Sequence, residues 1–470
     1  MPKTFSTWLD IELRAGSILG LLQVSFNKEA AAPPPALPVL EAGPGCPAWA
    51  LRAGQRAAYR PVAPSLWARR LDRIFLHPVW GVLTFGVVVV AVFQAMFSWA
   101  RPLMDACQWL VSRSGAWIGA LLPDSWLRSL VVEGVWAGVG SVVIFLPQLL
   151  VLFVFLWLLE DSGYLERAAL IADRALARVG LQGKCFIPLV AAHACATPAI
   201  LAARSIENRR ERTATILIAP LMSCSARLPV YTLVIAAFLP ERPLLGPLVG
   251  ARAAAILGLY LLGFLAAFGT ARLLRSSLLK SDQTPVVLDM PPCRWPTLRS
   301  LALRLLEASK VFLRRAGTVI LGVSVLWWLL AHWPLKDGQP PPIGESLAGK
   351  AGHALEPLIR PLGFNWQIGV GLISSLVSRE AIIGTLGTIH AMDPDARALG
   401  LQAALRKDLD AAGAAALLVF FALMMPCVST LAMVRRETGS WKWPLAQFAY
   451  MGALAYAGGF LVNRLVRLLA

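Results

Sequence analysis

The fold of this chain is decided by two similar stretches, APLMSCSARLPVY at residues 219–231 and FALMMPCVSTLAMVRRETGSWKW at residues 421–443. Each stretch places a cysteine, Cys224 or Cys427, beside a proline or another helix breaker inside an apolar segment. Soft sulfur ligands favour late or borderline transition metals, and irregular backbone is tolerated in a bilayer only where it is buried or lines a cavity. The two stretches therefore indicate a membrane protein with a metal pathway.

The composition is that of a polytopic membrane protein. The 470 residues are 57% hydrophobic, and apolar runs repeatedly reach the length of about 20 residues that a membrane span needs. The formal net charge of +17 is carried between the apolar segments rather than along one solvated face, so we interpret it as a topology signal and expect no nucleic-acid partner. The N-terminus lacks the pattern of a cleavable signal, so we expect the first span to be retained.

The cysteines do not form a disulfide pattern. Seven are present, without a CxxC pair or a regular extracellular spacing. Cys195, Cys224 and Cys427 lie inside apolar segments close to prolines. A single cysteine in such a place is usually a small buried hydrophobe, but three in equivalent contexts favour metal handling.

The chain is predicted to have two parts. Residues 1–65 contain a short amphipathic stretch and a segment rich in Ala, Pro and Gly, which indicate a tail or linker rather than a domain. Residues 66–470 are predicted to form one all-α membrane domain. No GxxxxGK[ST] phosphate loop occurs in the sequence, so we expect neither nucleotide hydrolysis nor any other enzymatic activity from this chain.

Nine apolar segments follow the N-terminal part. They lie at about 79–99, 136–159, 186–203, 213–238, 246–270, 316–331, 367–390, 411–434 and 443–463. Prolines interrupt several of them, so we expect broken helices as well as continuous spans.

Positive charge predicts the orientation of these segments. Arginines before the first span and the basic loop at 271–315 are assigned to the cytoplasm, and the loop at 332–366 to the outside. The segment at 186–203 lies between charged stretches, so it is expected to enter and leave the membrane on one side as a re-entrant segment. About eight transmembrane helices then remain, with both termini in the cytoplasm, and the positive residues at 435–442 fit this count poorly.

An internal repeat organises the membrane domain. LVAAHACATPAILAARS followed by APLMSCSARLPVY corresponds loosely to GLISSLVSREAIIGTLGT followed by ALMMPCVSTLAMVRRE. An odd number of crossings between the copies would invert one relative to the other, as in secondary transporters that build a midplane site from broken helices. We therefore predict two inverted repeats, at about 184–270 and 367–463.

The same residues resemble the membrane domain of the FeoB family of bacterial ferrous-iron transporters. The resemblance runs from about Leu66 to the C-terminus, and LEDSGY at 159–164, MSCSARLPVY at 222–231 and RRETGSWKW at 435–443 are its most specific parts. It implies a multi-pass permease of the bacterial inner membrane with two gate repeats. It also implies that the gates handle metal through cysteines, and the matching positions here are Cys195, Cys224 and Cys427.

The sequence departs from the family pattern in three places. FeoB proteins usually begin with a GTP-binding domain and a helical spacer, and neither is recognised here. The first gate usually reads Gly-Phe-Gly-Cys-Asn-Val-Pro-Ala, whereas this chain has AHACATPA at 192–199. The usual Ala-Lys-Glu of the second gate is Ser378-Arg379-Glu380, which keeps a cation followed by a carboxylate.

Acidic residues within or beside spans are functional candidates because burying a charge in a membrane is costly. Glu380 lies beside Arg379 in an otherwise apolar run, where it either attracts a divalent cation or pairs internally. Glu160 and Asp161 end the second span, where they form either an acidic exit for a cation or an ordinary solvated helix end.

Other residues are assigned to the backbone breaks or to the metal. Arg227 is expected to satisfy carbonyl groups freed by a break. Broken backbone is expected to be maintained by Pro198, Pro229 and Pro426. His193 precedes Cys195 by two residues, and because imidazole suits Fe, Zn and Ni it is either a metal ligand or a hydrogen-bonded core residue.

These features predict an inner-membrane transporter that takes up Fe(II) through cysteine-lined gates, with no tightly bound cofactor. The candidate metal residues are Cys195, Cys224, Cys427, Glu380 and His193. Candidate partners besides the lipid bilayer are a separate GTP-binding protein, a small Feo accessory protein and a second copy of the chain. Two alternatives remain open: a transporter of another divalent metal or of a nucleoside-like solute, and a non-transporting scaffold that recruits a soluble partner through the loop at 271–315.

Overall fold

The structure of the protein is a computed structural model. It describes residues 72–469 apart from 74, 76, 78, 124, 242–249, 278, 280–297, 335–340, 378, 391–396 and 426, and the described residues belong to one compact unit. The N-terminal segment predicted at 1–65 lies outside the described residues, as do Ser378 and Pro426.

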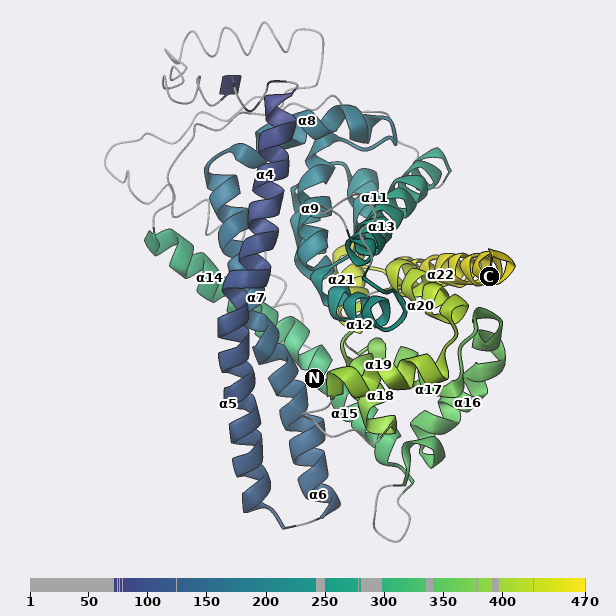
Figure 1. Cartoon of the computed structure of the whole chain (residues 1–470). Helices are drawn as coiled ribbons and strands as arrows, with labels where there is room; N and C mark the ends of the chain where they lie inside the picture. The colour runs from purple at the N-terminus through teal and green to yellow at the C-terminus, as the bar shows by residue number, and fades with distance from the viewer. Residues whose placement is uncertain are drawn as a thin grey trace, which may run out of the picture. The chain divides into compact units, whose positions relative to one another are not determined.

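All regular secondary structure in the described residues is helical (Figure 1). The first part is a hairpin of two long antiparallel helices. Its elements are α4 (Trp80–Gln94), a π-helical stretch (Ala95–Trp99), α5 (Ala100–Leu121), α6 (Trp126–Ser129), a second π-helical stretch (Leu130–Trp136) and α7 (Ala137–Asp161). At 1.5 Å per residue the outgoing helix, from Trp80 to Leu121, is about 60 Å long, twice the hydrocarbon core of a bilayer.

The hairpin is longer than the sequence pattern indicated. Apolar periodicity predicted a span over 79–99 and assigned no helix to 100–120, yet α5 continues the same helix without a break. Arg101 and Arg113 interrupt the apolar run of α5, so it does not look like a span. The polar part of the helix is instead stabilised by packing against the second helix, where the indole nitrogen of Trp136 donates to the Val111 carbonyl oxygen at 2.9 Å.

The rest of the chain forms a bundle of shorter helices. The first half contains α8 (Tyr164–Ala177), α9 (Phe186–Ala194), α10 (Ala196–Ala202), α11 (Arg209–Ile218), α12 (Leu228–Phe238) and α13 (Ala251–Ser276). The second half contains α14 (Leu298–Phe312), α15 (Thr318–His332), α16 (Leu347–Ile359), α17 (Trp366–Ser375), α18 (Ala381–Ile389), α19 (Arg397–Asp408), α20 (Ala411–Leu423), α21 (Val428–Thr438) and α22 (Lys442–Leu469).

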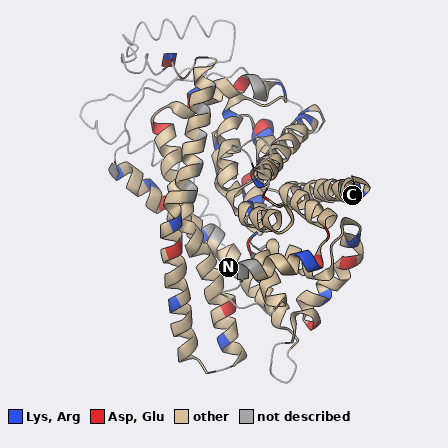
Figure 2. Ribbon diagram, in the orientation of Figure 1, with Lys and Arg blue, Asp and Glu red and all other residues tan. Residues whose placement is uncertain are grey.

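The helices have the length and composition of membrane spans. Five stretches of the described chain are long and apolar enough to cross a bilayer: Trp126–Asp161, Arg209–Phe238, Ala251–Ser276, Ala411–Thr438 and Lys442–Leu469. The shorter helix Thr318–His332 is also apolar. Figure 2 shows few charged residues along these helices. The protein is therefore an all-helical, multi-pass membrane protein.

Two helix pairs and two broken helices occupy corresponding places in the halves. In the first half, α9 and α10 meet at Cys195, and the helix from α11 to α12 is interrupted at 219–227. In the second half, α17 and α18 meet at 376–380, and the helix from α20 to α21 is interrupted at 424–427. The interruptions at Cys195, 219–227 and 424–427 lie in segments where the sequence pattern predicted breaks, whereas the one at 376–380 was not predicted.

The two halves exchange the second parts of their broken helices. Val434 of α21 is buried in the same hydrophobic core as Ile200 of α10, in the first half. Val234 of α12 is buried in the other core with Ile382 of α18, in the second half. Each half therefore depends on the other for its folded core, and the interruptions lie where the chain passes between the cores.

Candidate functional site

The three cysteines that the sequence pattern selected line one cavity. Cys195, Cys224 and Cys427 surround a space of about 140 Å³, and Glu380 and Arg379 line it as well. These side chains come from the interruptions of four different helical segments, so residues up to 232 positions apart are brought together by the exchange between the two halves.

Each of these cysteines immediately precedes a helical turn. The backbone is extended at Cys195 (φ −155°, ψ 135°), before α10, and at Cys427 (φ −167°, ψ 163°), before α21. Cys224 (φ −83°, ψ 162°) precedes the 3₁₀ turn that leads into α12. The first N–H groups of a helix carry partial positive charge, and the three cysteines lie beside such groups.

The carboxylate of the site has the same relation to a helix. Glu380 is the residue before α18 (Ala381–Ile389), and it lines the cavity from the second half of the chain. A carboxylate at a helix N-terminus is stabilised by the same partial charge. The four candidate ligands of the cavity are therefore all potential anions placed at the starts of helices.

Two buried arginines hold the interrupted backbone. Arg227 is fully buried and donates to the carbonyl oxygens of Pro220 at 3.0 Å, Leu221 at 3.4 Å, Met222 at 3.3 Å and Met424 at 3.0 Å. These carbonyls lie in the two breaks and lack a helical partner, so the guanidinium replaces hydrogen bonds that water cannot supply within a membrane.

Arg379 does the same from the second half. It is 4% exposed and donates to the carbonyl oxygens of Met424 at 2.6 Å, Met425, and Phe421 at 3.4 Å. Its guanidinium also lies 5.0 Å from the centroid of the Phe421 ring. The carbonyl of Met424 accepts from both arginines, so the two breaks are tied together at one backbone atom.

Hydroxyl groups extend the polar lining beside the thiols. The Cys427 sulfur lies 2.9 Å from Ser429 Oγ and 3.1 Å from Thr430 Oγ1. Ser225, which follows Cys224, donates from its hydroxyl to the Ala194 carbonyl oxygen at 2.9 Å. The sequence analysis did not select these hydroxyls, although a Ser or Thr within three positions after each cysteine is visible in CAT, CS and CVST.

A second group of polar atoms lies behind the thiols. Ser223 Oγ, Arg227 Nε and Tyr231 Oη are buried without a hydrogen-bond partner in the described structure. Such groups are normally satisfied by ordered water.

The cavity is not a preformed coordination sphere. Among the residues that the structure describes, no three His, Cys, Asp or Glu side chains are close enough together to hold a metal ion. An ion in this space would meet the thiols and the carboxylate singly or in pairs.

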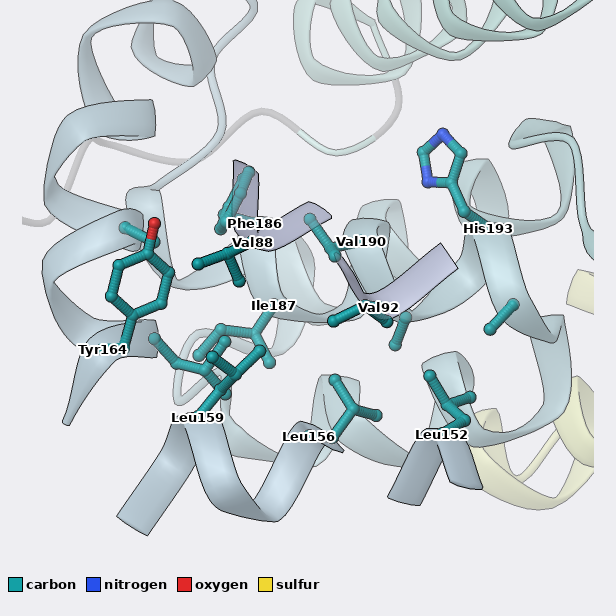
Figure 3. Close-up of a pocket in the computed structure, with 14 residues that line it drawn as sticks. Val88, Val92, Leu152, Leu156, Leu159, Tyr164, Phe186, Ile187, Val190 and His193 are labelled. Atoms are coloured by element: carbon teal, nitrogen blue, oxygen red, sulfur yellow. The ribbon is translucent and has the colours of Figure 1, made fainter. Parts of the chain in front are cut away.

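His193 lines a different cavity from the one lined by the cysteines. It is one of the residues around an apolar space of about 40 Å³, and Figure 3 shows its ring directed away from Val92 and Leu152. Its Nδ1 donates to the Leu189 carbonyl oxygen at 3.1 Å, and the ring stacks on Tyr260 with centroids 6.2 Å apart. It does not line the cavity of the cysteines.

The acidic pair at the end of the second span is divided between two environments. Asp161 forms an ion pair with Arg304 of α14 at 3.3 Å. Glu160 lines an open cavity of about 440 Å³ together with Glu166 of α8. Pairing neutralises one carboxylate, and the other faces a space large enough for water.

The prolines of the breaks occupy positions where a helix tolerates them. Pro229 lies in the first turn of α12, and Pro198 is buried in the first turn of α10. The N–H groups of a first turn have no helical acceptor, so proline loses nothing there and fixes a suitable φ angle.

Comparison with known proteins identifies the family. The model of the Gate family, described as nucleoside recognition, matches residues 142–238 and 313–441, and that of the ferrous iron transport protein B C terminus matches residues 256–307. The Fe(2+) transporter FeoB of Leptospira interrogans is 40% identical over 412 residues, covering 84% of this chain and 59% of that protein. The chain belongs to the FeoB family.

Other FeoB relatives match the same part of the chain. FeoB of Staphylococcus aureus (strain COL) is 38% identical over 409 residues, covering 84% of this chain and 58% of the relative. A Porphyromonas gingivalis protein named as a fusion of Fe(2+) transport protein A and FeoB is 35% identical over 464 residues, covering 89% and 53%. This FeoB chain thus spans less than two thirds of the length of these relatives, and it corresponds to their membrane portion.

One solved structure has a weak likeness to the chain. The inward-facing, substrate-bound structure of CNTnw aligns with 81% of this chain and 88% of its own at 15% identity, with a TM-score of 0.34. A TM-score this low establishes neither fold nor function.

Proposed function

We propose that this FeoB chain is an inner-membrane permease that takes up Fe(II) through the cavity of Cys195, Cys224, Cys427 and Glu380. The proposal rests on one observation: the helix interruptions of both halves deliver these four groups to the same space. The curated relatives are named as Fe(2+) transporters, which supports Fe(II) as the substrate.

The size of the cavity favours an ion over an organic solute. Its volume of about 140 Å³ holds about four or five waters at about 30 Å³ each, enough for a partly hydrated cation. Pockets for organic ligands usually measure about 300 to 1,000 Å³. The volume therefore argues against a nucleoside-like solute, the alternative that the description of the Gate family supports.

The chemistry of the lining suits a borderline divalent metal. Thiolates supply soft ligands and Glu380 a hard one, and Fe(II) accepts both. Each thiol must lose its proton when it binds the metal, so binding releases protons, and the thiolates take protons up again when the metal leaves. The nearby guanidiniums of Arg227 and Arg379 oppose a stable divalent complex and so favour release, which continuous transport requires.

The arrangement of the loops supports a topology with seven crossings and two re-entrant segments. The crossings lie at 80–99, 137–161, 209–238, 251–276, 318–332, 411–438 and 442–469. The re-entrant segments are α9 with α10 and α17 with α18. This arrangement differs from the eight crossings that the sequence analysis predicted, because α17 and α18 form a helix pair that returns to the side from which it entered.

Two contacts between distant loops favour this arrangement. Arg204, directly after α10, forms an ion pair with Glu437 at the end of α21 at 2.6 Å. Arg406 of α19 donates to the Ala237 carbonyl oxygen near the end of α12 at 2.5 Å. Eight crossings would put the members of each pair on opposite sides of the membrane, whereas seven crossings put them on the same side.

A third contact fixes the last span in the same way. Asn463, near the end of α22, donates to the carbonyl oxygen of Leu362, which precedes α17, at 2.8 Å. The residues at 332–366 are assigned to the outside by their low positive charge, so the end of α22 is outside as well. The positive residues at 435–442 then lie in the cytoplasm, which removes the poor fit that the earlier count left.

The revised topology makes the two gate repeats inverted copies. The first re-entrant segment enters from the cytoplasm and the second from the outside, and each is followed by a broken span and a continuous one. Transporters of this architecture bind their substrate where the repeats meet, near the bilayer midplane. The cavity of the cysteines lies at that meeting point.

The membrane potential is sufficient to drive inward movement of a divalent cation. Moving two charges through 100 mV releases about 4.6 kcal/mol, twice the single-charge value. A separate GTP-binding protein would therefore act on gating rather than supply the whole driving force.

Uptake by proteoliposomes that contain only this chain tests the proposal. We expect anaerobic Fe(II) uptake with an inside-negative potential, and a decrease of at least about tenfold when Cys195, Cys224 and Cys427 are all replaced by Ser, because oxygen is a harder ligand of nearly the same size. Cys107 lies on α5, outside the cavity, so Cys107→Ser is the matched control and should not change uptake.

The other outcomes discriminate among the alternatives. Equal Fe(II) uptake by the triple variant and the control would remove the thiol pathway. Uptake of a nucleoside in place of Fe(II) would favour the organic-solute reading. Absence of any uptake, with a soluble protein copurifying stoichiometrically with the chain, would favour a scaffold.

A further inference from the structure

A histidine and a glutamate far from the gates face one another at the hairpin. Glu133 lies on the π-helical stretch Leu130–Trp136, and His332 is the last residue of α15. Glu133 Oε2 is 3.4 Å from His332 Nε2. In the proposed topology, both residues lie at the outer ends of their spans, on the side of the membrane away from the cytoplasm.

The hydrogen bonds of His332 determine which ring nitrogen carries its proton. Nδ1 is 3.0 Å from the Trp328 carbonyl oxygen, and a carbonyl can only accept, so Nδ1 carries the hydrogen. In the neutral imidazole, Nε2 is then an acceptor with a lone pair. Ser129 Oγ lies 3.4 Å from Nε2 and accepts the indole N–H of Trp328 at 3.1 Å, so its own hydrogen is available to the other acceptors.

Two acceptors that face one another need a donor or a cation between them. The Ser129 hydroxyl supplies at most one hydrogen to the pair, and a proton on Nε2 or a metal ion would bridge the carboxylate and the ring directly. Two ligands that are each about 2.1 Å from a metal lie about 3.4 Å apart in tetrahedral geometry and about 3.0 Å apart in octahedral geometry. The observed 3.4 Å separation is therefore wide for a hydrogen bond and suitable for two ligands of one metal.

The surroundings match those of a metal-binding histidine. A ligating imidazole almost always donates its other N–H to a carbonyl or carboxylate, which orients the ring, and the Trp328 carbonyl does this for His332. Glu133 also lines an open cavity of about 500 Å³, so water can supply the remaining ligands. Arg128 lines the same cavity, and its charge would keep the affinity moderate.

From this geometry we infer that Glu133 and His332 form a second metal site, which takes a divalent cation of borderline softness from the outer solution. Nitrogen and carboxylate ligands suit Fe(II), Co(II) and Zn(II) alike. The inference rests on the proposed function for its cargo and its side of the membrane. It shares no residue with the cavity of the cysteines, so the two can be tested separately.

Two other histidine–carboxylate pairs in the described chain lack these features. His390 Nε2 and Asp408 Oδ2 are 2.8 Å apart, a direct hydrogen bond with no room for a metal. His353 uses Nδ1 toward Glu356 at 3.6 Å, one helical turn away on the same helix, and stacks on Trp366 with centroids 4.6 Å apart. His353 therefore provides a matched control, since His332 stacks on Trp328 at nearly the same distance, 4.5 Å.

The test is equilibrium binding of Co(II) to the purified full chain in detergent. Cys195, Cys224 and Cys427 are replaced by Ser so that their thiols do not bind Co(II). Tight binding by the Glu133–His332 pair can then be measured. In this background we expect Glu133→Gln and His332→Gln each to weaken Co(II) binding by at least about tenfold, in line with the loss of one ligand from a small site. His353→Gln should leave binding unchanged.

The outcomes either support or overturn the site. Glu133 is 61% exposed, so we expect Glu133→Gln to fold and to remain informative if His332→Gln does not. Unchanged binding in Glu133→Gln would show that a proton alone bridges the pair. An equal loss in His353→Gln would show unspecific binding by surface histidines, which overturns the inference equally.

Transport gives a second readout with the cysteines intact. A capture site raises the local metal concentration without taking part in passage, so Glu133→Gln should increase the KM for Fe(II) about tenfold and leave the maximal rate unchanged. If the chain does not transport Fe(II) at all, the proposed function fails, and the binding experiment still decides on this site. A decrease in the maximal rate alone would contradict a capture role.

Discussion

The two gates solve the same backbone problem with residues from different places. In the first gate, Cys224 and Arg227 lie three residues apart, and the guanidinium binds carbonyls of its own break. In the second gate, the thiol is Cys427, but the guanidinium comes from Arg379, which lies between α17 and α18 rather than in the break itself. An interrupted helix in a membrane needs donors for its free carbonyls, and any element that reaches them can supply the donor.

The helix pairs α9–α10 and α17–α18 differ in the side chain that they present to the cavity. Cys195 precedes α10 in the first gate, and Glu380 precedes α18 in the second. Both are at the start of the second helix of a pair, and both line the cavity. Under the proposed function, an ion in the cavity meets a soft ligand from one half and a hard ligand from the other, and this asymmetry suits a borderline metal.

Removal of either arginine should have the largest effect on the molecule. Arg227→Met leaves three buried carbonyls without a donor, because Met424 still accepts from Arg379, and each unsatisfied group costs about 1 to 3 kcal/mol. We expect Arg227→Met to destabilise the fold by at least about 3 kcal/mol and Arg379→Met, which leaves two carbonyls without a donor, by less. Thermal unfolding in detergent measures this difference.

The exposed Arg101 on α5 supplies the control for charge removal, and Arg101→Met should not change the unfolding temperature. An equal loss for all three variants would indicate a general effect of charge. A larger loss for Arg379→Met than for Arg227→Met would show that the second break, rather than the first, is the more dependent on its guanidinium.

Exchange of the hard ligand for a soft one should change metal selectivity. Glu380→Cys makes the second re-entrant segment like the first, so we expect uptake of Zn(II) relative to Fe(II) to rise about tenfold, equivalent to about 1.4 kcal/mol. Competition uptake in proteoliposomes measures this ratio. Glu160→Cys, at the end of the second span and outside the cavity, serves as the control. An unchanged ratio in Glu380→Cys would exclude the carboxylate as a ligand.

The ion pair that joins the gates should have a smaller effect. Arg204→Glu breaks the pair with Glu437, and the second substitution Glu437→Arg should restore it. Because Arg204 is 56% exposed, the coupling between the two changes is expected to be at most about 1 kcal/mol. A double-mutant cycle on thermal stability measures it. No coupling would remove one of the three contacts that support seven crossings.

His193 should have the smallest effect on the cavity. The sequence analysis made it a candidate ligand, and the structure places its ring beside Tyr260 and the Leu189 carbonyl. From this placement, His193→Phe should alter the total rate or stability and leave the ranking of Fe(II), Zn(II), Co(II) and Ni(II) unmoved. A changed ranking in competition uptake would restore the ligand prediction.

Local motifs made part of this site predictable. Cys195, Cys224 and Cys427 were selected because each lies beside a breaker in an apolar run, and a break next to a thiol is a local property of the chain. The family resemblance, carried by similarly local motifs, is confirmed by the FeoB relatives. Arg227 was expected to bind carbonyls for the same reason, since its acceptors at 220–222 are near in sequence.

Features that depend on distant contacts were not predictable. Nothing near Arg379 indicates that it reaches Met424, because the exchange of helices between the halves creates that contact. The predicted number of crossings depended on whether the segment 367–390 crosses the membrane or returns to the side from which it entered. Its apolar composition fits both possibilities. The pair of Glu133 and His332 was missed because the two residues are 199 positions apart and neither belongs to a motif.

X-ray absorption spectroscopy of the Fe(II)-loaded chain tests the central claim most directly. We expect that Fe(II), bound anaerobically to the Glu133→Gln variant so that the Glu133–His332 pair is disabled, has sulfur among its nearest neighbours. The sulfur contribution should disappear when Cys195, Cys224 and Cys427 are replaced by Ser. A spectrum with only nitrogen and oxygen neighbours before that replacement would contradict the claim that the two gates pass iron between their thiols.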